Sequence, residues 1–206
     1  MIWMAGFTVI PLLMVFYYGL TDRSGAFTLA NILAIGSSEH LKALWLSLAL
    51  AGVSTVICLL LAYPLALILR KRHIGKGSFV VFIFILPMWM NFLLRTMAWQ
   101  TLLEKNGVIN TFLTMLHLPN IAIINTPAAI ILGMVYNFLP FMVLPIYNTL
   151  AKIDDNVINA ARDLGADNYQ TLTKILLPLS VPGIVSGITM VFVPALTTFV
   201  ISNLLG

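Results

Sequence analysis

The feature that most restricts this chain is a run of 27 residues, 43–69, without any Asp, Glu, Lys or Arg. A helix that crosses a bilayer needs ~20 mostly apolar residues. The whole chain of 206 residues is 60% hydrophobic and 9% charged, whereas soluble domains carry roughly 25% charged residues. A chain of this length cannot build a core large enough to bury that much apolar surface in water. The sequence therefore predicts an all-α integral membrane protein, a polytopic helix bundle.

Apolar runs of this kind predict five membrane spans. They lie at residues 1–21, 43–69, 77–103, 126–150 and 181–206. Residues 106–125 also lack charge, but proline and asparagine interrupt them, which predicts a loop or a short interfacial helix. Prolines lie inside the predicted spans at positions 11, 64, 87, 140, 145 and 194. Neighbouring helices can satisfy the carbonyls that such prolines free. Static kinks and moving hinges both remain open, and so many prolines favour a transporter over a simple anchor.

The basic residues between the spans predict the orientation of the chain. The loop 70–76 carries four Lys or Arg and the loop 152–180 carries three, against only Arg23, Lys42 and Lys105 on the other side. Positive charge collects on the cytoplasmic side of a membrane, so we expect the N-terminus and the loops 70–77 and 151–180 in the cytoplasm. We expect no signal peptide, because no basic region precedes the first apolar run. The basic residues do not form a stripe, which argues against a nucleic-acid partner.

The segment 159–178 is unusually polar for this chain and is predicted to be two short helices joined by a bend. Asp154 and Asp155 can cap the first helix, in which the apolar residues Val157, Ala160, Ala161 and Leu164 share one face. Gly165 is suited to end that helix in a left-handed conformation. Asp167 with Gln170 resembles a capping box for the second helix, and Pro178 and Pro182 are expected to mark the return to the membrane. The first helix is either an interfacial amphipathic helix or a docking helix for a cytoplasmic protein.

The same segment resembles the EAA loop of ABC-importer permeases, with the pattern E-A-A-x3-G-x9-I-x-L-P. The matching residues are Asn159, Ala160, Ala161, Gly165, Ile175, Leu177 and Pro178. Asn159 stands where the family usually has Glu. The resemblance implies that residues 151–180 form a cytoplasmic coupling loop, which docks on an ATP-binding subunit and couples its closure to alternating access. The chain has no phosphate-binding loop motif of its own, so the resemblance assigns ATP and Mg to a partner ATPase, with no cofactor bound by this chain.

Four further segments resemble the spermidine/putrescine permeases within that family, at residues 86–103, 135–154, 160–166 and 193–206. The resemblance implies a single transmembrane permease domain over residues 1–206 in a bacterial cell membrane. It also implies the partners, namely a second permease subunit, two ATP-binding subunits and an extracytoplasmic solute-binding protein. The family usually has six spans in this subunit, so we expect the sixth to be missing from a C-terminally incomplete chain. An ABC permease for another small solute, an ion-coupled secondary transporter and a membrane enzyme are the alternatives.

A pathway for a cationic solute would have to use aromatic and amide side chains, because the predicted spans contain no Asp or Glu. The candidates are Trp89, Asn91, Trp99, Tyr136, Asn137 and Asn203. Each has a structural alternative, since Trp and Tyr populate membrane interfaces and Asn often bonds a neighbouring helix. Arg95 is the charge deepest in a predicted span, and we expect it to reach the outer interface or to pair with Glu104 or with the solute-binding protein. The spacing of the histidines predicts no metal site, and no catalytic motif is present.

Overall fold

The computed structural model describes residues 2–22, 25–71, 86 and 88–206. Every regular element in this described part is a helix, with one isolated β-bridge between Thr21 and Phe27. The chain divides into two compact units, Met1–Leu48 and Ala49–Gly206, and helix α3 runs through both. The helices are α1 (Ile2–Gly19), α2 (Ala30–Ile35), α3 (Ser38–Lys71), α5 (Phe92–Leu103), α6 (Val108–Met115), α7 (Pro127–Leu150), α8 (Asp155–Asp163), α9 (Asn168–Thr171), η1 (Leu172–Leu176), α10 (Leu177–Thr197) and α11 (Phe199–Leu205).

The first unit contains α1, α2 and the beginning of α3. The turn after α1 is held by the bridge between Thr21 and Phe27. Asn31 of α2 donates from Nδ2 to the carbonyl oxygens of Tyr18, at 3.3 Å, and Thr21, at 3.1 Å. These bonds satisfy carbonyls that the end of α1 leaves without helical partners. The predicted first span therefore corresponds to α1, an apolar helix that ends at Gly19.

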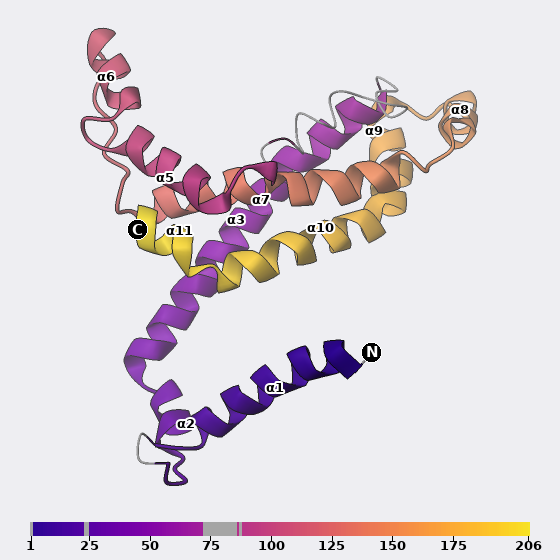
Figure 1. Ribbon diagram of the computed structural model, residues 1–206. Helices are drawn as coiled ribbons and strands as arrows, with labels where there is room; N and C mark the ends of the chain where they lie inside the picture. Colours follow the sequence, from indigo (N-terminus) through magenta and orange to yellow (C-terminus); the bar gives the residue numbers. More distant parts are fainter. Residues whose placement is uncertain (1, 23–24, 72–85, 87) are drawn as a thin grey trace. The chain divides into compact units, whose positions relative to one another are not determined.

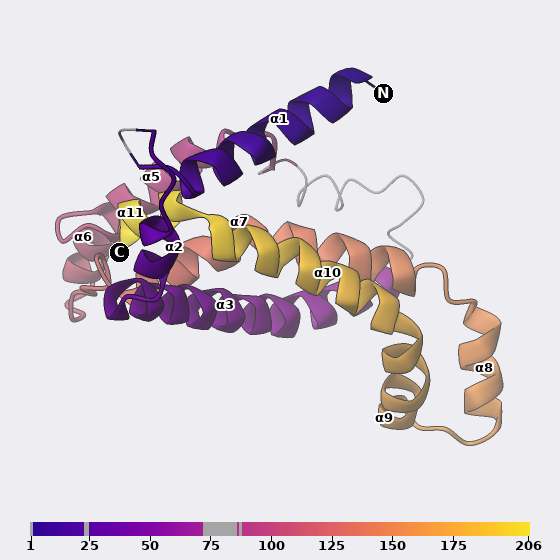
Figure 2. The ribbon, with the colours of Figure 1, turned by 90° about the horizontal axis from the view of Figure 1, so that it is seen from below.

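In the second unit, α7 and α10 lie side by side, and α3 runs across them and contacts both (Figures 1 and 2). The side of α3 that is buried here carries small residues, among them Ala51, Cys58, Ala62 and Ala66. Small side chains let helix backbones approach closely, which is how helices gain contact in a membrane. Ser54 Oγ donates to Met134 Sδ across this interface, and the hydroxyls of Tyr63 and Ser180 bond at 3.2 Å between α3 and α10.

Gly183 and Gly187, four residues apart on α10, lie directly against α7. A Cβ added to Gly183 would lie 2.5 Å from Thr149 Oγ1 and 2.8 Å from the carbonyl oxygen of Pro145. A Cβ added to Gly187 would lie 2.7 Å from Met142 Sδ. This is the small-xxx-small spacing that lets membrane helices pack backbone to backbone, a packing signal that was not among the predictions made from the sequence.

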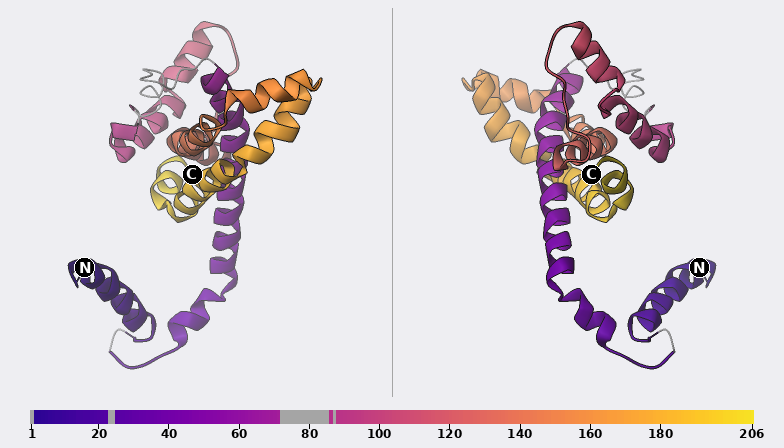
Figure 3. Two further views of the ribbon diagram at one scale, coloured as in Figure 1. Left: turned by 90° about the vertical axis from the view of Figure 1, so that its right-hand side faces the viewer. Right: turned by 90° about the vertical axis from the view of Figure 1, so that its left-hand side faces the viewer.

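The helices α5, α6 and α11 lie at the end of this unit that is opposite to α8 and α9 (Figures 1 and 3). Phe92 of α5 stacks on Phe138 of α7 with ring centroids 6.4 Å apart, and α11 packs on both helices with Ile201 and Leu205 buried. The buried side chain of Asn110 bonds the carbonyl oxygens of Glu104 and Ile121 and the amide of Ile121. The sequence predicted a loop or a short interfacial helix at residues 106–125. The structure has the short helix α6 in this segment.

Three helical stretches are long and apolar enough to cross a membrane in the part of the chain that the structure describes: Ser38–Lys71, Pro127–Leu150 and Asn168–Thr197. The first two confirm the predicted spans at 43–69 and 126–150. The helix that contains the predicted last span is continuous from Asn168, so no helix boundary lies at the predicted start near residue 181, and where the membrane span begins stays a prediction. Its predicted continuation to the chain end is interrupted at Thr198, whose ψ of 111° leaves the helical region. Residues 77–85 and 87 of the predicted third span and residues 72–77 of the predicted cytoplasmic loop 70–77 lie outside the described residues, so this loop and the number of five spans stay predictions.

We expect Gly183→Ala to lower the unfolding free energy by about 1–3 kcal/mol, because the added methyl group collides with Thr149 and with the backbone of α7. Gly52→Ala is the matched control, since nothing lies within 4 Å of a Cβ at this position of α3. The control is expected to be neutral or slightly stabilising, because alanine favours helix over glycine. Thermal unfolding of both variants in detergent micelles measures the difference, and equal midpoints would contradict the proposed packing.

Candidate functional site

The segment 151–180 projects from the end of the bundle where α7 ends and α10 begins (Figure 2). Asp154 caps α8 by accepting from the backbone N–H of Asn156 at 2.9 Å. Gly165 ends this helix with φ at +86°, and the N–H of Ala166 donates to the carbonyl oxygen of Ala161 at 3.0 Å. This is a left-handed glycine C-cap, which confirms the predicted role of Gly165 in the bend.

The second short helix begins with the predicted capping box and then continues directly into the membrane helix. Asp167 Oδ1 accepts from the N–H of Gln170 at 2.7 Å, and Gln170 Oε1 accepts from the N–H of Asp167 at 3.3 Å. The π-helical turn η1 follows, in which the N–H of Leu177 donates to the carbonyl oxygen of Leu172. Pro178 comes directly afterwards and has no N–H to donate. We expected Pro178 and Pro182 to mark the return of the chain to the membrane. The helix does not break at these prolines, because the π-turn before Pro178 keeps the chain helical.

Arg70, at the end of α3, joins three parts of the unit. Its Nε donates to the carbonyl oxygen of Leu150 at 2.8 Å, and its Nη2 donates to that of Ile153 at 2.9 Å. Nη2 also forms an ion pair with Asp155 Oδ1 at 2.8 Å. The two carbonyls belong to the end of α7 and the turn after it, and that of Leu150 also accepts from the N–H of Ile153 at 3.2 Å. Arg70 thereby fixes the start of α8 to the ends of α3 and α7.

The apolar stripe predicted on α8 faces away from the bundle. Val157 and Ala160 are exposed, and Leu164 is 89% exposed, whereas Ile158 on an adjacent face of the helix is buried at 7% exposure. An exposed apolar stripe on a short helix is a surface that a second protein can cover. The other residues of the EAA-like pattern follow the same division: Asn159, Gly165, Leu177 and Pro178 are exposed, and Ala161 and Ile175 are half-buried.

A groove of about 670 Å³ lies between α3, α8, α9 and η1. Arg70, Lys71, Asn159 and Arg162 contribute to its lining. Arg162 Nη2 reaches Asn168 Oδ1 at 3.5 Å, so it links α8 to α9 across the bend. Asn159 and the basic residues Arg70, Lys71 and Arg162 thus line the same groove.

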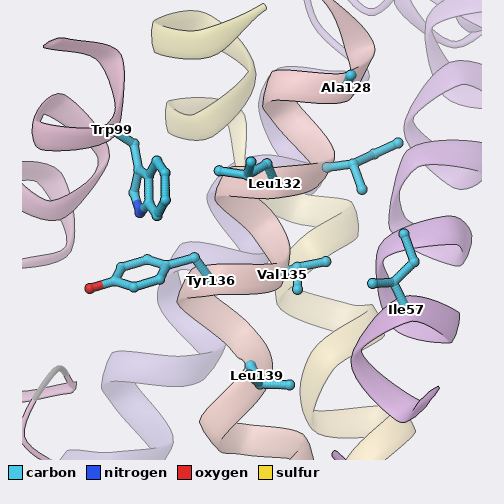
Figure 4. A pocket seen from close by; sticks show the side chains of 8 residues that line it. Ile57, Trp99, Ala128, Leu132, Val135, Tyr136 and Leu139 are labelled. Atoms are coloured by element: carbon cyan, nitrogen blue, oxygen red, sulfur yellow. The ribbon is translucent and has the colours of Figure 1, made fainter. Parts of the chain in front are cut away.

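Among the pathway candidates, the structure brings Trp99 and Tyr136 together. Their rings meet edge to face with centroids 5.2 Å apart, and both line an apolar groove of about 530 Å³ between α3, α5 and α7. Figure 4 shows the two rings side by side, with Ile57 facing the groove from α3. The π faces of two adjacent aromatic rings are a surface that attracts a cation.

The other pathway candidates are dispersed. Asn91 caps α5, because its Oδ1 accepts from the N–H of Leu93 at 2.8 Å. Asn137 is buried at 1% exposure, and its Nδ2 donates to the carbonyl oxygen of Gly133 while its Oδ1 has no partner. Trp89 is 77% exposed, and Asn203 is exposed on α11. Their role in transport stays a prediction.

The structure does not contain the expected pair of Arg95 with Glu104, and the reach of Arg95 to an outer interface or to the solute-binding protein stays a prediction. Arg95 is 7% exposed, and it forms no ion pair with any described residue. It lies on the side of α5 that packs into the unit, between Phe92 and Trp99, which both contact aromatic residues of α7. The sequence could place Arg95 in an apolar helix, but not on its inward face, because Phe, Leu and Met surround it in sequence on all sides.

The sequence matches a family of membrane proteins over residues 1–206, a family described as the inner membrane component of binding-protein-dependent transport systems. It is 37% identical to the spermidine/putrescine transport system permease PotB of Haemophilus influenzae, over 99% of this chain and 74% of that protein. It is also 37% identical to PotB of Escherichia coli, over 99% of this chain and 77% of that protein. The fold is similar to a bacterial alginate ABC transporter solved in complex with an alginate-bound periplasmic protein, with a TM-score of 0.66 and 20% identity over 88% of this chain and 68% of that chain.

We expect Arg70→Lys to loosen α8, because a single ammonium cannot reproduce the guanidinium contacts to two carbonyls and a carboxylate. Charged hydrogen bonds contribute roughly 1.5–3 kcal/mol each, so amide hydrogen exchange in α8 should accelerate by roughly ten-fold or more. Lys152→Met is the matched control, since Lys152 is exposed in the same turn. Unchanged exchange in Arg70→Lys would show that the three contacts do not hold the helix in place.

Proposed function

Because the chain belongs to the family of binding-protein-dependent transport system inner membrane components, we propose that residues 151–180 couple it to an ATPase. In this proposal the chain is a permease subunit of an ATP-driven importer. The observation that carries the coupling role is the exposed apolar stripe of α8, on a helix that Arg70 ties to two membrane helices. A docking helix has to be both accessible to its partner and rigidly joined to the parts that it moves.

The exposure of α8 favours a protein partner over a lipid surface. Ala160 and Ala161 add little apolar area, so insertion among lipid tails would gain little free energy. Small side chains let the backbone of another protein approach closely. Asp155, Asp163 and Arg162 surround the stripe with charge, which is the polar rim typical of a protein–protein interface.

Two mechanical connections support the transmission of force from α8. Arg70 joins the start of α8 to α3 and α7. The helical stretch Asn168–Thr197 begins within the segment 151–180 and continues into the bundle without a break. A displacement of α8 is therefore passed to all of the long helices of the second unit. Gly183 and Gly187 hold α10 against α7, so that the two helices move as a pair.

The assembly implied by this role contains a second permease subunit, two ATP-binding subunits and an extracytoplasmic solute-binding protein. ATP and Mg are used by the ATP-binding subunits. The loops 70–77 and 151–180 then lie on the cytoplasmic side of a bacterial cell membrane, where ATP is available, and alternating access carries the solute inward. The excess of Lys and Arg in these loops supports that orientation.

We infer polyamines, spermidine or putrescine, as the solutes. The names of the two PotB relatives support this substrate class, and so does the chemistry of the groove at Trp99 and Tyr136. Adjacent aromatic rings attract ammonium groups through their π faces without a charge of their own. Carboxylates for a multivalent cation would come from the partner subunits, because the predicted spans of this chain hold none.

The docking proposal predicts that Leu164→Glu leaves membrane insertion intact and weakens binding of the ATP-binding subunits. A charge in the centre of an apolar interface is expected to reduce affinity at least ten-fold, or about 1.4 kcal/mol. Leu118→Glu is the matched control, since Leu118 is also exposed but lies after α6. Co-purification of the ATP-binding subunits with each variant is the measurement, and equal recovery would refute docking at α8.

The substrate proposal is tested by uptake of labelled spermidine and putrescine in cells with and without the gene. Energy-dependent uptake should be lost on deletion and restored by the gene. The strain must lack other polyamine importers, so that a second system cannot mask the loss. Unchanged uptake would leave the coupling role intact and remove polyamines as the substrate.

A further inference from the structure

The groove between α3, α8, α9 and η1 carries more positive than negative charge. Arg70, Lys71 and Arg162 line it, against the single carboxylate of Asp155. Asp155 is already in an ion pair with Arg70 at 2.8 Å. Lys71 and Arg162 are both exposed, and within the described part of the chain neither of them forms an ion pair. A concave surface with an excess of positive charge attracts an anion.

The two unpaired cations come from different helices. Lys71 is the last residue of α3, and Arg162 lies in the last turn of α8. Arg162 Nη2 reaches the neutral amide oxygen of Asn168, at 3.5 Å, and Asn159 adds an amide group to the lining. A phosphate group has several acceptor oxygens, so it can accept from a guanidinium, an ammonium and an amide at the same time. The polar part of the lining therefore fits a phosphate.

The rest of the lining is apolar and belongs to the membrane helices. Leu67 of α3 and two leucines of η1 line the groove and are half-buried. Leu67 lies in the uncharged run 43–69, and no Asp, Glu, Lys or Arg follows Lys174 in this chain. The groove thus lies where the charged residues of α3 and of the stretch Asn168–Thr197 give way to apolar ones. Basic pockets between membrane helices at such a boundary are suited to phospholipid headgroups.

The groove uses a different face of α8 from the exposed apolar stripe. The residues of α8 that line it follow the spacing i, i+3, i+4 and i+7, which places them on one face of the helix: Asp155, Ile158, Asn159 and Arg162. The stripe consists of Val157, Ala160 and Leu164, which face another direction. A ligand in the groove leaves the stripe uncovered, so it is distinct from the protein partner proposed for the stripe.

We propose that this groove binds the phosphate of an anionic phospholipid such as phosphatidylglycerol, an inference that goes beyond the proposed function. The phosphate chemistry by itself also suits a soluble phosphate compound. The leucines of the lining favour the lipid, because only a lipid has acyl chains that gain free energy by contact with them. The bound phosphate connects α3 to α8, because it accepts from Lys71 on the first helix and from Arg162 on the second.

Binding can be measured on the full chain in a neutral detergent, by the fluorescence anisotropy of phosphatidylglycerol labelled on one acyl chain. Lys71→Gln and Arg162→Gln should each raise the Kd of this lipid roughly five-fold, since each removes one charge from the headgroup site. Lys152→Gln is the matched control, because Lys152 is exposed in the turn after α7 and does not line the groove. Its Kd should equal that of the unmodified chain.

Lys71→Gln also separates lipid binding from the integrity of α8. Lys71 is exposed and lies outside α8, so a loss of binding in this variant does not arise from the link between Arg162 and Asn168. An equal loss in Lys152→Gln would show a diffuse attraction to positive charge and would overturn the inference. No ATP-binding subunit is present in this measurement, so its result does not depend on docking at α8.

Two competitors distinguish the source of the phosphate. Glycerol 3-phosphate, which has the phosphate without acyl chains, should displace the labelled lipid at least ten-fold less well than unlabelled phosphatidylglycerol. Equal displacement by the two would assign the groove to a soluble phosphate compound and overturn the lipid. Equal displacement by zwitterionic phosphatidylcholine and by phosphatidylglycerol would overturn the anionic site and leave the groove to an acidic side chain of a docked protein.

Discussion

Lipid gives two helices no hydrophobic reason to associate, so residues 49–206 depend on how closely their helix backbones can approach. At Gly183 and Gly187, α10 lies so close to α7 that an added Cβ would collide with α7. The buried side of α3 also carries small residues, and α3 contacts both α7 and α10. Dispersion contacts grow with the number of atoms within reach, and close backbones bring many atoms together. The remaining helices of this unit pack onto that three-helix centre.

The segment 151–180 is held in position by this three-helix centre. The α7 end supplies the carbonyls that Arg70 binds, and α10 is the continuation of α9 and η1. Asp154 and Gly165 then define where α8 begins and ends. Each of these local devices acts at a helix end, where backbone groups lack helical partners. The exposed stripe of α8 is thereby held out from the bundle, and the buried Ile158 anchors its other side.

The sequence predicted the elements with local signals and missed the ones that depend on packing. Apolar length located α3 and α7, and the caps at Asp154, Gly165 and Asp167 were correctly identified, because capping uses residues within a few positions of each other. The continuous helix through Pro178 was missed, because proline normally ends a helix and a π-turn leaves no residue signature. The Gly183-x3-Gly187 spacing was available in the sequence as a packing signal.

Side-chain partners across helices could not be predicted. Arg70 was used only as a charge that orients the loop, since nothing local indicates that it meets residues 80 or more positions away. Arg95 was expected at an interface, because hydropathy does not say which face of α5 turns inward. The meeting of Trp99 with Tyr136 likewise depends on how α5 lies on α7. These contacts belong to the tertiary arrangement, which one sequence does not encode by periodicity alone.

The π-turn at Leu172–Leu176 also bears on how this family can vary in length. A π-turn contains one residue more than the α-helical turn that it replaces. Losing one residue there would restore a regular α-helix. The segment 151–180 would then keep its orientation about the helix axis relative to the bundle. Losing one residue elsewhere between Asn168 and Thr197 would rotate this segment by about 100° about the helix axis. We therefore expect single-residue gaps among homologues to be confined to η1 within this stretch, because only there can the chain change length while the docking face keeps its direction.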